Sequence, residues 1–553
     1  MEMVSYLGEL VQKQEMTINI AGSASEILVK MVCSGNTAIR KAALDVLVQI
    51  SSHHPNAKTL VDAGAVPVMV QELFIRKIDD EPVGSKTEAA AVLANIVESG
   101  LDPEAITVNK EGHVITSKYS VYNFAHMLKS SMPDTLNLSI VRVLLALTAL
   151  PKHLATVVSV MKEQDSSQTV IELMDSLTES LVIAAMKLLI ALSPKMGHTI
   201  AEKLCKAPGQ PGKLVKSIGL HGRIMERHAM SATLLAKLPY QHMALNLALI
   251  NEGAVVTVLA KIEEMQRGEA RASRHAKAYM EGLVGVLVRL TTTLYDPDVL
   301  LAAMDHNLTS VLADLVRSAG SDEVQRLAAV GLENLSSQSP NLSQPPTEER
   351  RPKKKNILRR LREAHAGRVH DNNRRPAAHS GRVCPVHRGV CSPSTTFCLV
   401  EAGAVEGLLG VLESSENGRV VEAALGALCT LMDDDVDVTS GVAVLAEHDA
   451  ARHVLRALRQ RRNDGRRGAG AVAGAGAGGG ETVTRRCFWA VERFLAHGGE
   501  RCVREVTSDR ALPSLLVSAF HTGDAATKQV AESVLRCLHR MPDYSATYES
   551  VEL

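Results

Sequence analysis

The sequence predicts an all-α solenoid, in which short helices stack in series around one continuous apolar core. Three observations support this fold class. At 553 residues the chain is longer than one ordinary domain, so a repeat array or several domains are expected. Hydrophobic residues make up 46% of the chain but aromatic residues only 3%, which suits closely packed helices better than sheets. A fourteen-residue phrase also recurs as LVDAGAVPVMVQEL (60–73), LINEGAVVTVLAKI (249–262) and LVEAGAVEGLLGVL (399–412).

Each copy of the phrase places a glycine immediately before a run of apolar residues at helical spacing. Gly64, Gly253 and Gly403 stand where one helix must turn sharply into the next, a position that favours a residue tolerating positive φ. Pro67 falls in the first turn of the following helix, where proline is accepted. We interpret the phrase as the turn and third helix of a stacked unit.

A second kind of helix is rich in small residues. Its apolar positions recur at three and four residues, and its alanines and glycines let neighbouring helices approach closely. The segments of this kind are 87–97, 181–193, 227–238, 326–336, 421–431 and 528–538.

The helices of the first kind recur at a nearly regular interval. Where no insertion intervenes, the step is about 41 to 55 residues, close to the ~40–47 residue period of armadillo and HEAT units. A stack of such units buries apolar faces that no unit buries alone, whereas unrelated amphipathic helices are the less favoured alternative. The predicted starts are Ala65, Ser120, Thr169, Lys213, Ala254, Leu308, Ala404, Arg452 and Ala511.

The motif AGAVP, with helices such as AAVLANIV and AAVGLENLS, resembles armadillo repeats over about four-fifths of the chain. This resemblance implies a right-handed superhelical solenoid, which we expect two disordered loops to interrupt. The predicted division is an armadillo array over 1–339, a basic insertion over 340–396, armadillo repeats over 397–462, a Gly/Ala-rich loop over 463–481 and C-terminal armadillo or capping helices over 482–553.

A narrower resemblance is carried by CPVHRGVCSPSTTFCLVEAGAVEGLLGVLE (384–413), LAKLPYQHMALNLALINEGAV and GLENLSSQSPNLS. These segments are similar to the armadillo array of plant U-box proteins, in particular the senescence-associated U-box ligases. The resemblance implies ubiquitin ligation, in which a U-box recruits the ubiquitin-conjugating enzyme and the array selects the target. The Cys-Pro-Ile and Asp-Pro-Val segments of a U-box do not precede the repeats, so we expect a fragment or a partner that supplies the U-box.

Charge and cysteine content bound the compartment and the partners. Lys plus Arg and Asp plus Glu both number 61, so only a local patch would attract a membrane or nucleic acid. Nine irregularly spaced cysteines indicate reduced thiols. Since the sequence begins with no secretory signal and has no uninterrupted run of eighteen apolar residues, we expect a cytoplasmic protein without a membrane span, with the plasma-membrane surface and the nucleus as alternatives.

The insertion carries the strongest local charge. From Arg350 to Arg375 it has eleven basic residues against two acidic ones. This patch suits an anionic membrane surface or an import receptor, and the alternative is a solvated loop. Because no aromatic residue interleaves the run, nucleic acid is disfavoured. The basic positions singled out are Lys353, Lys354, Lys355, Arg359, Arg360 and Arg362.

Four soft metal ligands follow the basic run within fifteen residues. Thiolate and imidazole suit tetrahedral zinc, but intervals of two, three and six residues match no common zinc finger. We therefore prefer ordinary reduced cysteines, predict no cofactor, and expect the last of the four to begin a buried helix. The residues are Cys384, His387, Cys391 and Cys398.

No phosphate loop, nucleophile elbow or His-Glu-x-x-His motif is present, so no catalytic residue is predicted. We expect a target polypeptide to bind a concave groove lined by side-chain amides at Asn95 and Asn334, with Thr430 at the equivalent position. Armadillo import adaptors carry a tryptophan four residues earlier, where this chain has Ala91, Val330 and Gly426. We therefore predict the target-recognition part of a U-box-type ubiquitin ligase; the alternative is an armadillo adaptor or membrane-tethered scaffold outside the ubiquitin pathway.

Overall fold

The computed structural model describes residues 18–74, 84–220, 222–268, 273–318, 320–343, 383–467 and 477–541. Within these residues every regular element is a helix, and the extended pairing is limited to two isolated bridges, Thr107–Val114 and Val383–Val390. The predicted all-α solenoid is confirmed. The chain divides into two compact units, one of residues 1–252 and 269–282 and the other of residues 253–268 and 283–553.

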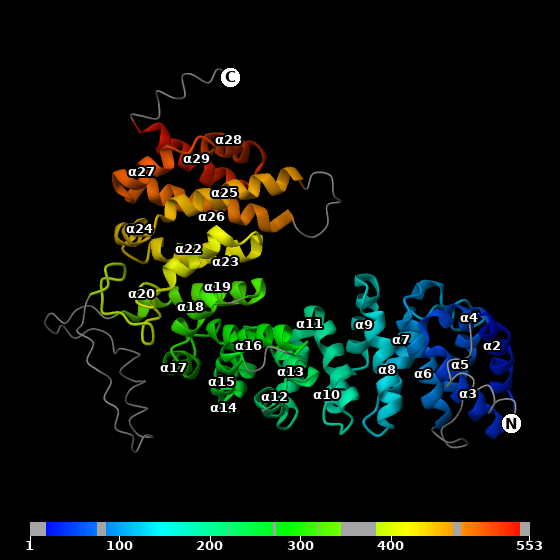
Figure 1. Ribbon diagram of the computed structural model, residues 1–553. Helices are drawn as coiled ribbons and strands as arrows, with labels where there is room; N and C mark the ends of the chain where they lie inside the picture. The colour runs from blue at the N-terminus through cyan, green and yellow to red at the C-terminus, as the bar shows by residue number, and fades with distance from the viewer. Residues whose placement is uncertain are drawn as a thin grey trace, which may run out of the picture. The chain divides into compact units, whose positions relative to one another are not determined.

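The first unit contains the following helices and the beginning of α16 (Figure 1). They are α2 (Ile18–Val32), α3 (Thr37–Ser51), η1 (His54–Asn56), α4 (Ala57–Asp62), α5 (Ala65–Phe74), α6 (Gly84–Glu98), η3 (Pro103–Ala105), α7 (Lys118–Met127), α8 (Asp134–Leu147), α9 (Pro151–Glu163), α10 (Ser167–Leu173), α11 (Glu179–Lys206), α12 (Gln210–Gly219), α13 (Glu226–Lys237) and α14 (Met243–Asn251).

The second unit contains α15 and most of α16, followed by the C-terminal helices. Its helices are α15 (Ala254–Arg267), α16 (Ala276–Thr291), α17 (Pro297–Asp305), α18 (Leu308–Ser318), α19 (Asp322–Ser336), α20 (Ser339–Leu342), α22 (Ala404–Ser414), α23 (Gly418–Cys429), η4 (Thr430–Met432), α24 (Val438–Glu447), α25 (Ala450–Arg467), α26 (Ala477–His497), α27 (Gly499–Thr507), α28 (Leu512–Thr522) and α29 (Ala525–His539).

The repeating unit is a triplet of a short, a medium and a long helix, as in α17–α18–α19 and α27–α28–α29. The long third helices pack side by side, α3, α6, α8, α11 and α13 in the first unit and α19, α23, α26 and α29 in the second (Figure 1). The buried residues of these helices are mostly Leu, Val, Ile and Ala. Each triplet therefore buries its apolar face against the next one.

In its first two copies the recurring phrase forms the end of the first helix, the turn and the second helix, whereas in the third copy it forms a non-helical turn and the second helix. The helices of the phrase are α5, α15 and α22. Each is the second helix of its triplet, so the prediction that they are third helices was wrong. The sequence misled because the first helix is very short; α4 ends at Asp62, inside the phrase itself. The predicted starts at Ala65, Ala254, Leu308 and Ala404 are confirmed, and the other five lie within three residues of observed starts.

Helix α11 joins two triplets. Its N-terminal half packs as a third helix against α8, and Pro194 marks the point where it continues as the first helix of the next triplet. Among the described helices it is long and apolar enough to cross a membrane by length and composition, and two bent helix pairs also qualify if each is counted as one span. In the structure 61% of its most apolar window is buried. Packing against α8, α10 and α13 accounts for that hydropathy.

Two triplets have a non-helical turn where the first helix is expected. Before α7, residues 106–115 form a turn closed by the Thr107–Val114 bridge. Its centre is held by Asn109, which bonds the ring and the backbone amide of His113 at 2.9 and 3.0 Å. Before α22, residues 383–403 likewise contain no α-helix and are closed by the Val383–Val390 bridge.

The segment predicted as a Gly/Ala loop is partly helical. Helix α25 continues to Arg467 and α26 begins at Ala477, so both helices enter the interval 463–481.

A side chain at the turn glycine of the phrase should be unfavourable because of the backbone conformation, and not because of a steric clash. Gly64 has φ +76°, and no atom lies within 4 Å of the place that a Cβ would take, so Gly64→Ala meets backbone strain but no clash. We expect the free energy of unfolding to fall by about 1–2 kcal/mol. Gly410, in the interior of α22, has equally open surroundings but ordinary helical φ. Gly410→Ala should raise stability by about 0.5–1 kcal/mol.

Thermal and urea unfolding of the two variants would measure these effects. If Gly64→Ala and Gly410→Ala changed the free energy of unfolding by the same amount in the same direction, the assignment of Gly64 to a left-handed turn would be contradicted.

Asp134 gives the first unit a pH-dependent contact. Its carboxylate, at the start of α8, accepts hydrogen bonds from Ser176 and Thr178 at 2.6 and 2.7 Å. The bond from Ser176 and then that from Thr178 lower the pKa of Asp134. A lowered folded-state pKa means that the stabilisation is complete above the ordinary carboxyl pKa of about 4 and is lost as pH falls through the folded value.

We therefore expect Asp134→Asn to reduce the unfolding free energy at pH 7 by about 1 kcal/mol, discounted for partial exposure. The difference from the unsubstituted protein should stay constant down to about pH 5 and narrow below it. Thermal midpoints across that range would measure it. Asp175→Asn is the control, because Asp175 only forms an exposed pair with Lys213 in this turn; a pH-independent effect of Asp134→Asn would refute the assignment.

Candidate functional site

The third helices carry the three polar positions that the sequence predicts for peptide binding. Asn95 lies near the C-terminal end of α6 and Asn334 near that of α19, while Thr430 directly follows α23. The structure thus places all three at corresponding positions of their triplets. Their role in binding a polypeptide stays a prediction. Their hydrogen bonds within the array determine which donors and acceptors remain for a ligand.

Asn95 joins three neighbouring third helices of the first unit. Its Nδ2 donates to Ser51 Oγ on α3 at 2.9 Å, and its Oδ1 accepts a bond from Arg142 Nη2 on α8 at 2.9 Å. Arg142 also forms an ion pair with Glu98 at 2.5 Å. Because Asn95 is only 9% exposed, its main role in the described structure is to satisfy the polar groups along these helices.

The second unit repeats this arrangement with different partners. Asn334 Nδ2 donates to Thr291 Oγ1 on α16 at 2.9 Å, and Thr430 Oγ1 lies 2.7 Å from Ser336 Oγ of α19. Asn334 is half-buried. An asparagine amide has two N–H donors and an acceptor oxygen, so one bond to Thr291 leaves capacity for a peptide backbone.

An ion pair crosses α23 on the same side of the second unit. Arg486 of α26 donates to Glu333 of α19 at 3.0 Å, although 153 residues separate them. The helix between them carries Gly426 at this point, where a Cβ would overlap both Arg486 Nη1 and Glu333 Oε2. Burial lowers the pKa of Arg486, but Glu333 outweighs it and the net shift is upward. A tryptophan at position 426 would displace this pair.

An aromatic residue that was not predicted from the sequence lies at the corresponding position of the next third helix. Trp489 of α26 is half-buried, and the guanidinium of Arg493 lies 5.0 Å from its ring centroid. Arg493 also pairs with Asp434 at 2.8 Å. Alignment of α26 with the other third helices would have found it, since Trp489 precedes Arg493 by the same four residues that separate Ala91 from Asn95. Arginine in place of asparagine hid the correspondence.

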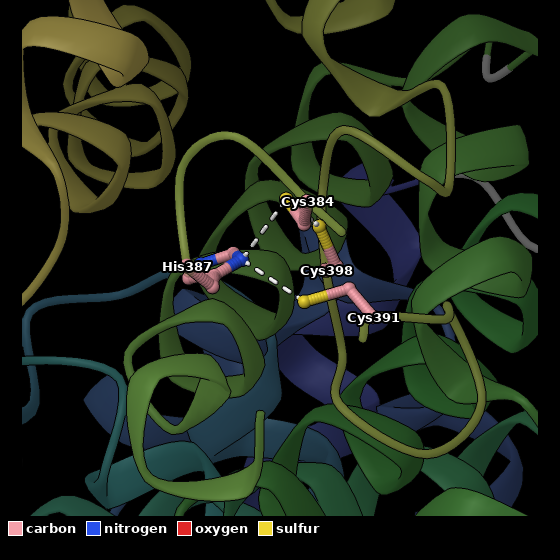
Figure 2. A group of neighbouring side chains, drawn as sticks. All are labelled: Cys384, His387, Cys391 and Cys398. Atoms are coloured by element: carbon pink, nitrogen blue, oxygen red, sulfur yellow. Dashed lines mark hydrogen bonds between the residues drawn. The ribbon is translucent and has the colours of Figure 1, made fainter. Parts of the chain in front are cut away.

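The four soft ligands converge in the turn before α22 (Figure 2). Cys384 Sγ and Cys391 Sγ lie 3.5 and 3.4 Å from His387 Nδ1. Cys384 Sγ lies 3.8 Å from Cys398 Sγ. All four candidate ligand atoms are within 4.8 Å of one another. Cys398 is buried as expected, but it does not begin a helix: α22 starts at Ala404, because the turn closed by Gly403 intervenes.

Hydrogen bonds within the cluster redistribute its protons. Bonds from Cys391 and Cys398 lower the pKa of the Cys384 thiol, and the bond to Cys384 raises that of Cys398. Burial lowers the pKa of His387, but bonding to Cys384 and Cys391 raises it to about 9. These bonds favour negative charge on the Cys384 sulfur beside a protonated His387, whereas Cys398 keeps its proton.

The predicted basic patch lies outside the described residues. Its members are Lys353, Lys354, Lys355, Arg359, Arg360 and Arg362.

Comparison with known proteins identifies plant relatives along almost the whole chain, although no protein-family model matches it. Putative U-box domain-containing protein 42 of Arabidopsis thaliana is 43% identical over 543 residues, which cover 98% of this chain and 50% of that protein. U-box domain-containing protein 44 of the same plant is 33% identical (100% and 64% covered), and U-box domain-containing protein 24 of Oryza sativa subsp. japonica is 32% identical (99% and 65%). The chain therefore spans between half and two-thirds of these relatives.

A crystal structure of an engineered protein matches the fold with a TM-score of 0.57 at 17% identity. The match covers 93% of this chain and 98% of the engineered chain. At that identity it supports the fold alone.

The ion pair over Gly426 can be tested by a double-mutant cycle. Glu333→Ala and Arg486→Ala should show a coupling of about 0.5–1 kcal/mol, because both side chains are partly exposed. In a Gly426→Ala background the coupling should approach zero, since the methyl group occupies the space of the pair. Chemical unfolding of the eight variants would measure it.

The matched control is the exposed pair Arg456–Glu413, which bridges α25 and α22 at 2.6 Å. Its coupling should be the same in both backgrounds. An undiminished Glu333–Arg486 coupling in Gly426→Ala would show that the pair does not depend on the glycine.

Proposed function

Since the chain belongs to the family of plant U-box domain-containing proteins, we propose that it is the target-binding array of a U-box-type ubiquitin ligase. The observation that carries the proposal is the alignment of 98% of the chain with a U-box domain-containing protein at 43% identity. Such a likeness along the array favours a shared use of the array.

The third helices supply the chemistry for holding a target polypeptide. In the second unit the third helices carry an aromatic ring at Trp489, both signs of charge in the Glu333–Arg486 pair, and the Asn334 amide. Tryptophan and arginine are the residues that most often dominate protein–protein binding energy. The amide suits backbone recognition of an extended peptide, whereas the charges suit selection of particular side chains.

Ubiquitin transfer itself is assigned to no residue of this chain. In the proposed arrangement the array holds the target, while a U-box in the same protein or a partner recruits the ubiquitin-conjugating enzyme. The array then contributes proximity, which raises the effective concentration of target lysines near the conjugated ubiquitin.

The proposed location is the cytoplasm, with peripheral contact to the anionic inner face of the plasma membrane. What supports this contact is the run of basic residues in the insertion, because clustered Lys and Arg are attracted to such a surface.

The proposal predicts that target selection depends on the third-helix face. The full chain joined to a U-box should be expressed in plant cells, and ubiquitinated lysines quantified by mass spectrometry of the glycine-glycine remnant. We expect the double variant Trp489→Ala/Arg493→Ala to lose a subset of modified proteins by about tenfold, as removal of one interface hot spot of about 1.4 kcal/mol or more would give. Self-ubiquitination through the U-box should be unchanged.

The control is Val517→Ala, on the second helix α28, where the side chain is 40% exposed. It should leave the set of modified proteins intact. An identical set for the double variant, the control and the U-box without the array would refute target binding by this face. Formation of ubiquitin chains by this chain with a conjugating enzyme, in the absence of any U-box, would refute the division of labour.

A further inference from the structure

We propose that Cys384, His387, Cys391 and Cys398 form a structural zinc site, which takes the place of the missing first helix before α22. Sequence spacing favours ordinary thiols at these positions, and the geometry of the cluster reverses that preference. The site does not depend on the ubiquitin-related function.

Three of the six distances between ligand atoms match a tetrahedral Cys3His site, and the other three are at most 4.8 Å. Zn–S bonds of about 2.3 Å and Zn–N bonds of about 2.0–2.1 Å at tetrahedral angles require S···S separations of about 3.8 Å and S···N separations of about 3.5 Å. Cys384 and Cys398 are 3.8 Å apart at sulfur, and the two S···Nδ1 distances to His387 are 3.5 and 3.4 Å. A disulfide, with its bond of about 2.05 Å, would need the two sulfurs to close together and would leave His387 without a role.

The convergence of four donors is otherwise unexplained. The Nε2 atom of His387 is buried and has no hydrogen-bond partner among the described residues, so the ring is oriented from its Nδ1 side, toward the sulfurs. The turn before α7 shows the alternative. There a first helix is also replaced, and ordinary hydrogen bonds between Asn109 and His113 hold the turn without any sulfur.

The backbone shapes a compact knuckle around the first three ligands. Cys384 N donates to Gly389 O at 2.7 Å and Arg388 N donates to Cys384 O at 3.0 Å. Arg388 and Phe397, each adjacent to a ligand, have φ of 51° and 55°. Such left-handed positions cost about 1–2 kcal/mol each for residues other than glycine. Metal ligation would offset that cost, because it contributes folding free energy directly.

The site links elements that contribute little core of their own. Ser339 of α20 bonds the carbonyl of Thr396, and Val386 of the knuckle accepts a bond from the Asp437 amide before α24 at 2.8 Å. Phe397 and Cys398 are fully buried and lead into α22. Four protein ligands leave no open coordination position, so the bound ion would be structural and not catalytic.

Metal content of the purified full chain tests the proposal. Prepared under reducing conditions with zinc present, the protein should contain about one zinc ion per chain by native mass spectrometry and elemental analysis. Cobalt(II) exchanged into the site should give thiolate-to-metal charge-transfer bands and the visible bands of tetrahedral cobalt. Cys384→Ser and Cys391→Ser should each lose most of the bound metal, whereas Cys33→Ser, which alters an exposed thiol elsewhere, should retain it.

A conservative variant distinguishes loss of a metal ligand from misfolding. His387→Cys should keep a tetrahedral site and shift the cobalt spectrum toward four sulfur ligands, with helical circular dichroism unchanged. Limited proteolysis should cut within 383–398 after chelation but not before. A folded, reduced protein without metal, a Cys384–Cys398 disulfide in the protein as isolated, or unchanged zinc content in the serine variants would each overturn the proposal.

Discussion

Close packing of successive third helices is the constraint on which the rest of the structure depends. A single triplet cannot bury its apolar face by itself, so its stability depends on packing against the adjacent triplets. Small residues permit the approach: a Cβ on Gly282 of α16 would lie 2.7 Å from Ala232 Cβ of α13, and one on Gly331 of α19 would lie 3.3 Å from Val288 Cγ2 of α16. Polar side chains at these junctions must then find partners across them, as Asn95 does with Ser51 and Asn334 with Thr291. The residues that form hydrogen bonds between neighbouring third helices therefore also border the third-helix face proposed for target binding.

The sequence predicts this architecture well because packing demands recur in every triplet. The glycine before α5, α15 and α22, the small residues of the third helices and the positions of the helix starts are local signals, and each reports a repeated requirement. What the sequence misses depends on residues brought together by the fold. The Glu333–Arg486 pair joins positions 153 residues apart, and the need for glycine at 426 follows only once that pair is seen.

The cysteine–histidine cluster shows the same limit in another form. Spacing rules for zinc fingers assume that a hairpin and a helix present the ligands. Here the fourth ligand, Cys398, follows six intervening residues and approaches because Thr396 and Phe397 are anchored in the core. A repeat lacking its first helix has less apolar surface to bury, so a compact alternative source of stability is useful there. The turn around Asn109 solves the same problem with hydrogen bonds.

The distribution of side chains on the third helices bears on how such an array would discriminate among targets. A regular row of tryptophans would hold repeated lysine stems along an extended peptide. This chain has a single tryptophan, with Arg493 against its ring, and an ion pair where another indole would stand on α23. In the first unit Ala91 stands at the corresponding position, and Asn95 is bonded by Arg142, which also pairs with Glu98. If a polypeptide binds this face, repeated recognition of one side-chain type is excluded by these differences. Selection would then depend on one aromatic contact and on local charge, which vary from triplet to triplet and favour few targets over many.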